Sequence, residues 1–415
     1  MNLAIPNKSN GYPFLIFKGA LILLVAAIPY SRAIISISTA LLFLSAVAEF
    51  IITKPKTNFK NIYFICLGAL VIFCFVDGLR AYSINEWVKS IEVKIPLLIF
   101  PFSIVIFQQK ISKSFLQLIS VVFCLSITIS VLASMFNYAN NYTQINQLIL
   151  QSKNVPIFGG MHHITYSVFG AFATIAAVVL AYQAKLNWMW ILALINLIGL
   201  HILTARTGLV GLYCTASLLG LVYFINHNPS KKIILLSLSA AIILPVAAYF
   251  TIGSFHNRAI NTWEDVKVIW NQKDANYQSM GMRVEAAKTS FSIVKKNPVI
   301  GIGNSNIKTA MAIQYESNNT NLFIENRILP HNQFIMELTV HGIIGLILLI
   351  IFFMFPLFNH FTKLPLLFIS IWSLVFFACM FECLFDRQHG IILVSLFWLL
   401  YSEYEVKNEL KMPEN

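Results

Sequence analysis

The stretch QFIMELTVHGIIGLILLIIFFMFPL, residues 333–357, decides the fold. Its only acidic residue is Glu337, and apolar side chains make up most of the remainder. A helix needs about 20 predominantly apolar residues to cross the ~30 Å hydrocarbon core of a bilayer. This stretch is long enough, and it therefore predicts a membrane-spanning helix.

The composition of the whole chain extends this prediction. Of its 415 residues, 58% are hydrophobic and 11% are charged, and the mean hydropathy is +0.73, as is typical of an integral membrane protein. Similar apolar stretches recur along the sequence, so we expect an all-α, polytopic membrane protein of about twelve transmembrane helices. The expected spans are residues 14–30, 33–52, 62–80, 91–107, 115–136, 164–183, 188–204, 208–226, 233–252, 333–357, 364–384 and 388–404.

Lysine residues orient these spans. Cytoplasmic loops of membrane proteins are enriched in positive charge, and alternate loops of this chain carry lysine. These are Lys54, Lys56, Lys60, Lys110, Lys113, Lys185, Lys231, Lys232, Lys363, Lys407 and Lys411. Both termini are therefore expected on the cytoplasmic side.

The arginines follow the opposite pattern. With this orientation all seven lie on the outer side: Arg32, Arg80, Arg206, Arg258, Arg283, Arg327 and Arg387. Arginine presents a rigid fork of donors that binds phosphate or carboxylate bidentately, whereas lysine acts as a point charge. The arrangement indicates a site for an anionic group outside the cytoplasm.

The chain divides into three regions. Residues 1–252 are expected to hold the first nine spans, residues 253–332 a large outward loop, and residues 333–415 the last three spans and a cytoplasmic tail. Within the loop, residues 283–296 place Val284, Ala287, Phe291 and Val294 at helical spacing, which predicts an amphipathic helix. Asn297-Pro298 ends that helix, and Gly301 and Gly303 then allow a tight backbone path.

Other classes of protein fit less well. The net charge of +12 is spread over short loops without an arginine-rich arm, so it reflects topology and not nucleic-acid binding. All six cysteines fall in apolar spans, which excludes a disulfide framework. His162-His163 lacks companion acidic or thiolate ligands for a metal, and Glu264-Asp265 has no companion that would make it a divalent-cation motif. Ionisable residues gather at the outer ends of the spans and form no central chain, which argues against a transporter.

Two residues are the main candidates for chemistry. Arg206 lies in a very short outward connection, LTARTGL, where interaction with lipid headgroups gains little. His331 follows Pro330 at the start of a long helix, where the helix dipole and nearby guanidinium groups favour a neutral imidazole that can accept a proton. A capping or interfacial histidine is the alternative. His341 is expected to pack against Glu337, four residues before it.

Further polar residues at the outer ends are candidates for contacts to the same anion. Arg80 and Arg387 are possible phosphate ligands, although either could instead meet lipid headgroups, and Asp386 could orient one of them. Asn332, Gly301 and Gly303 are expected to shape the site.

The order of these features resembles the O-antigen ligase and polymerase superfamily of bacterial inner-membrane glycan transferases. An arginine in a short outward loop precedes two spans and a large outward loop. That loop carries Arg283, then Asn297, Pro298, Gly301 and Gly303, and ends in His331, Asn332 and Gln333, followed by Glu337, Leu338, Gly342 and Gly345. Lys288 departs from the family pattern, in which an apolar residue is more usual.

This resemblance implies a fold related to the C-type glycosyltransferases and transfer of undecaprenyl-pyrophosphate-linked glycans without a metal or other cofactor. By position, Arg206 and Arg283 correspond to the arginines that hold the pyrophosphate, and His331 to the essential histidine. The implied acceptor is lipid A-core or another glycan, and the implied site faces the periplasm. The motifs leave ligase and polymerase open, and a transporter of lipid-linked glycans is a more distant alternative.

Overall fold

The computed structural model describes residues 11–55, 57, 61–151, 153–227, 229–270, 275–358 and 364–402. Within these ranges every regular element is a helix, which confirms the predicted all-α class. Lys56, Lys60, Lys363, Lys407 and Lys411, on which part of the orientation depends, lie outside the described residues.

Seven helices are long and apolar enough to cross a membrane. They are Arg32–Thr53, Ile62–Arg80, Ile84–Phe107, Lys113–Asn140, His163–Gln183, Arg206–His227 and Gln333–Phe358. Shorter apolar helices occupy Tyr12–Ala27, Met189–Leu203, Ala241–Thr251, Leu366–Cys379 and Gln388–Ser402. The protein is therefore a multi-pass membrane protein, while the total of twelve spans and their orientation stay predictions.

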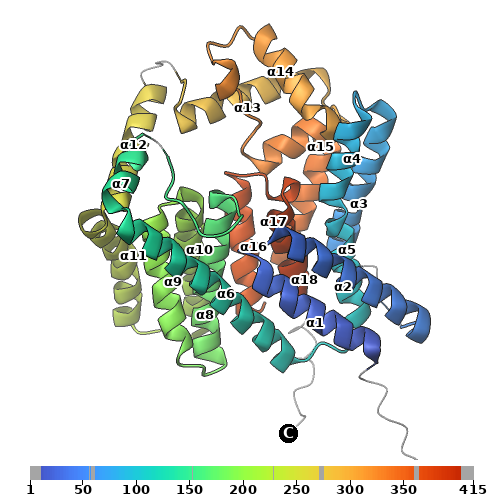
Figure 1. Cartoon of the computed structure of the whole chain (residues 1–415), viewed down its shortest axis with the longest axis vertical. Coiled ribbons are helices and arrows are strands. Elements are labelled where there is room, and N and C mark those ends of the chain that lie inside the picture. The colour runs from blue at the N-terminus through green and yellow to red at the C-terminus, as the bar shows by residue number, and fades with distance from the viewer. Residues whose placement is uncertain are drawn as a thin grey trace, which may run out of the picture.

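The N-terminal helices form one side of the bundle (Figure 1). Helix α1 packs along α2, and α5 packs against both α2 and α3. Their bounds are α1 Tyr12–Ala27, α2 Arg32–Thr53, α3 Ile62–Val76, η1 Asp77–Arg80, α4 Ile84–Lys94 and α5 Pro96–Phe107.

The middle helices form the other side, coloured green in Figure 1. Helix α8 is almost wholly buried and packs against α6, α9 and α10. The bounds are α6 Lys113–Asn140, α7 Tyr142–Leu150, α8 His163–Gln183, α9 Met189–Leu203, α10 Arg206–His227 and α11 Lys231–Thr251.

The C-terminal helices lie between these two groups and join them (Figure 1). Helix α16 packs against α8 and α10, whereas η7 and α18 contact α5. The bounds are α15 Gln333–Met354, η4 Phe355–Phe358, α16 Leu366–Cys379, η6 Leu384–Asp386, α17 Gln388–Ile391, η7 Ile392–Phe397 and α18 Trp398–Ser402. The buried Trp398 indole stacks on Phe352 of α15, so the last spans share one core.

Residues 253–332 contain helices α12, α13 and α14, of which α13 and α14 lie at one end of the molecule (Figure 1). The bounds are α12 Gly253–Trp270, α13 Ser279–Lys296, η2 Asn304–Asn306, α14 Ile307–Ser317 and η3 Ile324–Asn326. Helix α13 therefore includes the predicted amphipathic helix and begins four residues before it.

The buried face of α13 differs from the predicted one. Val284 and Phe291 are 39% and 46% exposed, whereas Ala286, Ser290 and Ile293 are buried against α14 and α15. Arg283 lies on this inner face, three residues before Ala286. The buried face differs from the predicted one because small side chains let α13 approach its neighbours closely while Arg283 faces inward.

Helix α15 is interrupted at Gly342, and the segment 298–303 crosses the break. Gly342 has φ +63°, and the amide of Ile343 donates to the carbonyl of Pro298 instead of continuing the helix. A second hydrogen bond joins the same two segments, in which Gly303 N–H donates to Val340 O at 2.8 Å. The backbones touch, since a Cβ on Gly342 would overlap the carbonyl of Val299. The loop thus supplies the hydrogen bonds that the broken helix lacks.

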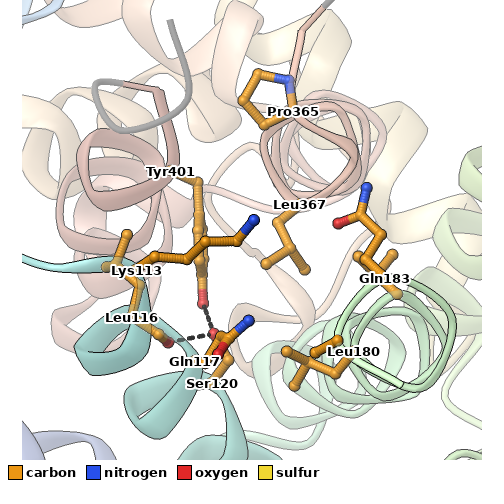
Figure 2. A pocket seen from close by; sticks show the side chains of 11 residues that line it. Lys113, Leu116, Gln117, Ser120, Leu180, Gln183, Pro365, Leu367 and Tyr401 are labelled. Carbon is orange, nitrogen blue, oxygen red and sulfur yellow. Dashed lines mark hydrogen bonds between the residues drawn. The ribbon is translucent and has the colours of Figure 1, made fainter. Parts of the chain in front are cut away.

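The opposite end of the bundle carries lysine. There Lys113 and Gln183, at the start of α6 and the end of α8, line a pocket of about 50 Å³, in which Tyr401 bonds Ser120 at 2.7 Å (Figure 2). The other end of α8, beginning at His163, lines a much larger cavity with arginine. Lys113 and the arginines of the larger cavity thus lie at opposite ends of the bundle, while the side of the membrane that each end faces stays a prediction.

Candidate functional site

A cavity of about 450 Å³ lies where the starts of α8, α10 and α15 meet the loop helices α12 and α13. Arg206, Arg283 and His331 all line it, although they are far apart in the sequence. Arg258 of α12 lines it as well. The structure therefore brings the three proposed catalytic residues together and adds a third arginine.

Arg206 is held by an acidic partner. Its Nη1 lies 3.1 Å from Oδ2 of Asp265 on α12, and Asp265 is buried. Asp265 therefore has a cationic partner that the sequence did not predict. The left-handed residue Thr204 ends α9, and α10 begins at Arg206, so the tight connection fixes the position of the arginine.

The other two arginines are held mainly by backbone oxygens. Arg283 donates to the carbonyl of Phe381 at 3.1 Å, and Arg258 donates to Lys153 O at 2.7 Å and Asn154 Oδ1 at 2.8 Å. Burial, followed by the charge of Arg206, lowers the pKa of Arg258 to about 10. Three guanidinium groups therefore face one cavity, where an anionic ligand would relieve their mutual repulsion.

His331 contacts a buried carboxylate. Its Nδ1 lies 3.2 Å from Oε2 of Glu382, in the connection between α16 and η6. Burial alone would raise the pKa of Glu382, but the hydrogen bond from His331 and the charge of Arg387 lower it to about 2. Glu382 is therefore ionised, and it orients the imidazole with Nδ1 toward the carboxylate.

Arg387 binds the second oxygen of the same carboxylate. Its Nε and Nη2 lie 3.2 and 3.1 Å from Oε1 of Glu382. Arg387 and Asp386 line a second cavity of about 640 Å³ between α2, α5 and α17, and His162 lines both cavities. Burial and then the charge of Arg387 lower the pKa of His162, so this residue is neutral at pH 7.

Several buried polar atoms around the two cavities have no hydrogen-bond partner within the part of the chain that the structure describes. They are His162 Nδ1, Thr165 Oγ1, Thr204 Oγ1 and Arg258 Nε. Buried polar groups are normally satisfied. Their concentration here indicates a site that is completed by a polar ligand.

Arg80 and the two glycines lie elsewhere. Arg80 donates to Asp77 and to the carbonyls of Gly301 and Ile300, at 2.9 and 3.0 Å for the latter two. Gly303 lies against the carboxylate of Asp77. Neither Arg80 nor the glycines line the described cavities. In this structure Arg80 holds the inserted segment 298–303 in place, and the two glycines are part of that segment.

Asn332 caps α15. Its Oδ1 accepts hydrogen bonds from Phe334 N and Ile335 N at 2.9 and 3.1 Å, and its Nδ2 donates to Met380 O at 3.0 Å. The side chain therefore fixes the start of the helix beside His331, which agrees with a role in shaping the site.

Asp386 pairs with a lysine and not with an arginine. Its Oδ1 lies 2.7 Å from Nζ of Lys94, which is 1% exposed, and Gln333 Nε2 donates to its Oδ2 at 3.4 Å. The prediction that Asp386 orients an arginine is therefore wrong. Glu382 has that role toward Arg387.

Lys94 also begins a chain of buried ionisable groups. Its Nζ lies 3.9 Å from Glu337, Glu337 lies 2.6 Å from His341, and His341 lies 3.5 Å from Asp77. The expected contact between His341 and Glu337 is confirmed. The expectation that ionisable side chains in the spans form no chain is wrong for these residues. Each charge has a partner, as burial within spanning helices requires.

Comparison with known families places this site in context. Residues 191–350 match the family model described as O-Antigen ligase. The match covers less than half of the chain and supports a relationship to the O-antigen ligase and polymerase superfamily. The matched family indicates glycan transfer of the ligase or polymerase type, on lipid-linked glycan substrates in general. No curated protein shows a significant match to the chain.

The region matched by the O-antigen ligase family contains Arg206, Arg283 and His331, whereas Glu382 and Arg387 lie beyond it. Sequence reasoning gave no role to Arg258, Asp265 or Glu382. An acidic residue in an otherwise apolar stretch was the available signal for Glu382. The partner of Asp265 depends on how α12 approaches Arg206, the first residue of α10, which no local pattern in the sequence reveals.

Proposed function

We propose that this protein is an O-antigen ligase. It transfers a glycan from undecaprenyl pyrophosphate to a hydroxyl of lipid A-core or a related acceptor, at the periplasmic face of the bacterial inner membrane. The observation that carries the proposal is the presence of Arg206, Arg258, Arg283 and His331 in one cavity. The family match supports the reaction class.

In this proposal His331 is the general base. With Nδ1–H directed to Glu382, the lone pair of Nε2 is available to accept the proton of the acceptor hydroxyl. The ionised Glu382 stabilises the imidazolium that forms, as a carboxylate does in a hydrolase triad. The proton later leaves to solvent.

The arginines act on the leaving group. As the acceptor oxygen bonds the anomeric carbon, the bond from that carbon to the pyrophosphate oxygen breaks, and its electron pair stays on the diphosphate. Arg206, Arg258 and Arg283 stabilise this charge, so the positive charge that a cation could supply comes from the protein. Attack opposite the leaving group in one displacement inverts the anomeric centre.

The test uses a deletion strain complemented with variants. His331→Ala should abolish attachment of glycan to its acceptor while protein level and lipid-linked donor remain, because the base is lost. Lys288→Ala, an exposed change on the neighbouring helix α13, serves as the control. Attachment at the wild-type rate in His331→Ala would refute the base assignment.

The deletion strain also separates ligase from polymerase, which share the donor anchor. Long-chain glycan left on its carrier supports ligation. Single repeat units attached to the acceptor support polymerisation and contradict the ligase proposal.

A further inference from the structure

The second cavity differs in chemistry from the first. Its wall is apolar and comes from two spanning helices, with Ile35 of α2 and Phe100 of α5 each 1% exposed. A cavity of about 640 Å³ falls in the range that accommodates an organic ligand. Because α2 and α5 are spanning helices, the apolar wall follows the direction of lipid chains.

The polar end of this cavity carries both signs of charge. Arg32 and Arg387 line it together with Glu92 and Asp386. The first cavity instead contains three arginines. A diphosphate fits the first cavity better, because carboxylates repel it, whereas alternating donors and acceptors suit the hydroxyl groups of a sugar.

The two cavities meet at His162, which lines both and whose buried Nδ1 has no partner among the described residues. A transferase must bring two substrates to one point. The shared wall next to His331 and Glu382 is where a donor in the first cavity and an acceptor in the second would meet.

We propose that the cavity between α2, α5 and α17, here named the acceptor cavity, binds a glycolipid acceptor. Its sugar headgroup lies against Arg32, Arg387, Glu92 and Asp386, and its aliphatic chains lie along α2 and α5. The inference rests on the proposed function and extends it, because it assigns the two substrates to separate cavities.

The test measures binding of two probes to the full chain in nanodiscs. The probes are rough-type lipopolysaccharide, which carries lipid A and core sugars, and undecaprenyl diphosphate. Ala40→Trp places a large side chain in the acceptor cavity from α2, and Ile37→Trp is its control on the same helix, since Ile37 is 58% exposed and does not line the cavity.

Ala40→Trp should weaken binding of the lipopolysaccharide by about tenfold or more and leave binding of undecaprenyl diphosphate unchanged. Arg283→Ala should have the reverse effect, and Ile37→Trp should bind both probes as the wild type does. The proposal would be overturned if Ala40→Trp lost binding of undecaprenyl diphosphate, or if the wild type did not bind the lipopolysaccharide. It would also be overturned if Ala40→Trp, Ile37→Trp and the wild type bound the lipopolysaccharide equally, or if the two tryptophan variants lost that binding to the same extent.

This outcome is independent of the catalytic test. If His331→Ala transferred glycan normally while Ala40→Trp lost the lipopolysaccharide alone, the base assignment would fail and the acceptor cavity would stand. If His331→Ala were inactive and Ala40→Trp bound both probes normally, only the acceptor assignment would fail.

Discussion

Nδ1 of His331 lies 3.2 Å from Oε2 of Glu382, and this contact determines which nitrogen of the imidazole remains for substrate. The other oxygen of Glu382 accepts two hydrogen bonds from Arg387. One buried carboxylate thus joins a residue of the first cavity to a residue of the acceptor cavity.

Replacing Glu382 by Gln should lower the rate of glycan transfer by about 10²-fold or more, the range of general acid–base catalysis. The amide keeps the shape of the side chain but cannot stabilise an imidazolium. The measurement is the rate with purified protein and saturating donor. Glu325→Gln removes an exposed carboxylate outside both cavities and should leave the rate unchanged; equal rates for the two variants would contradict the role of Glu382.

The same carboxylate should make stability depend on acid pH. The pKa of Glu382 falls from its ordinary 4.5 to about 2 on folding. The contribution of this ionised carboxylate to the free energy of unfolding is therefore complete above pH 4.5 and is lost as the pH falls through 2. The difference in unfolding temperature between wild type and Glu382→Gln in detergent should shrink as the pH falls from 4.5 toward 2. A difference that grew with acidity would exclude this explanation.

Two arginines should give contrasting phenotypes. Arg80→Ala removes the donors to Gly301 O and Ile300 O and should lower thermal stability without changing the affinity of the folded protein for undecaprenyl diphosphate. Arg283→Ala should weaken that affinity with a smaller effect on stability, since it loses one exposed hydrogen bond to Phe381 O. Measuring the unfolding temperature and the affinity for undecaprenyl diphosphate of both variants tests these separate roles. A loss of affinity in Arg80→Ala would show that Arg80 contributes to binding.

The sequence predicted those features that depend on local pattern. Hydropathy located the seven described helices that are long enough to cross a membrane, and the proline and histidine before residue 333 located the start of α15. It failed where partners come from distant segments. Asp386 was paired with an arginine because the two are adjacent in sequence, but the fold brings the ammonium of Lys94 to it from α4. Arg80 was placed at the anion because it is an outer arginine, although its donors are occupied by Asp77 and the inserted loop.

Lys94→Met should destabilise the protein by roughly 3–5 kcal/mol, the usual effect of removing one member of a buried ion pair. It leaves Asp386 without the lysine and removes one of the two ionisable partners of Glu337, the other being His341. The double variant Lys94→Met/Asp386→Asn should recover part of the loss, because fewer charges are left unpaired. Denaturant unfolding in detergent measures the free energy of unfolding of the two single variants and the double variant. If the effects of the two single changes simply added up in the double variant, direct pairing of Lys94 and Asp386 would be contradicted.

Gly342→Ala should destabilise the protein by about 1–3 kcal/mol or more, because φ there is +63° and the added methyl would overlap Val299. Gly220→Ala is the control, since nothing lies within 4 Å of a Cβ at that helical position. That variant should be neutral or slightly stabilising. Equal unfolding temperatures for the two variants would show that the break in α15 is not constrained by the inserted segment.

The insertion of residues 298–303 into α15 also bears on biogenesis. The amide of Ile343 donates to Pro298 O, which lies on a segment that precedes the helix in the sequence. Helix α15 therefore cannot reach its final hydrogen bonding before residues 298–303 lie in place beside it. A soluble fragment of residues 253–332 would lack the helix that completes it, so we expect such a fragment, expressed alone, to remain unfolded in hydrogen-exchange experiments.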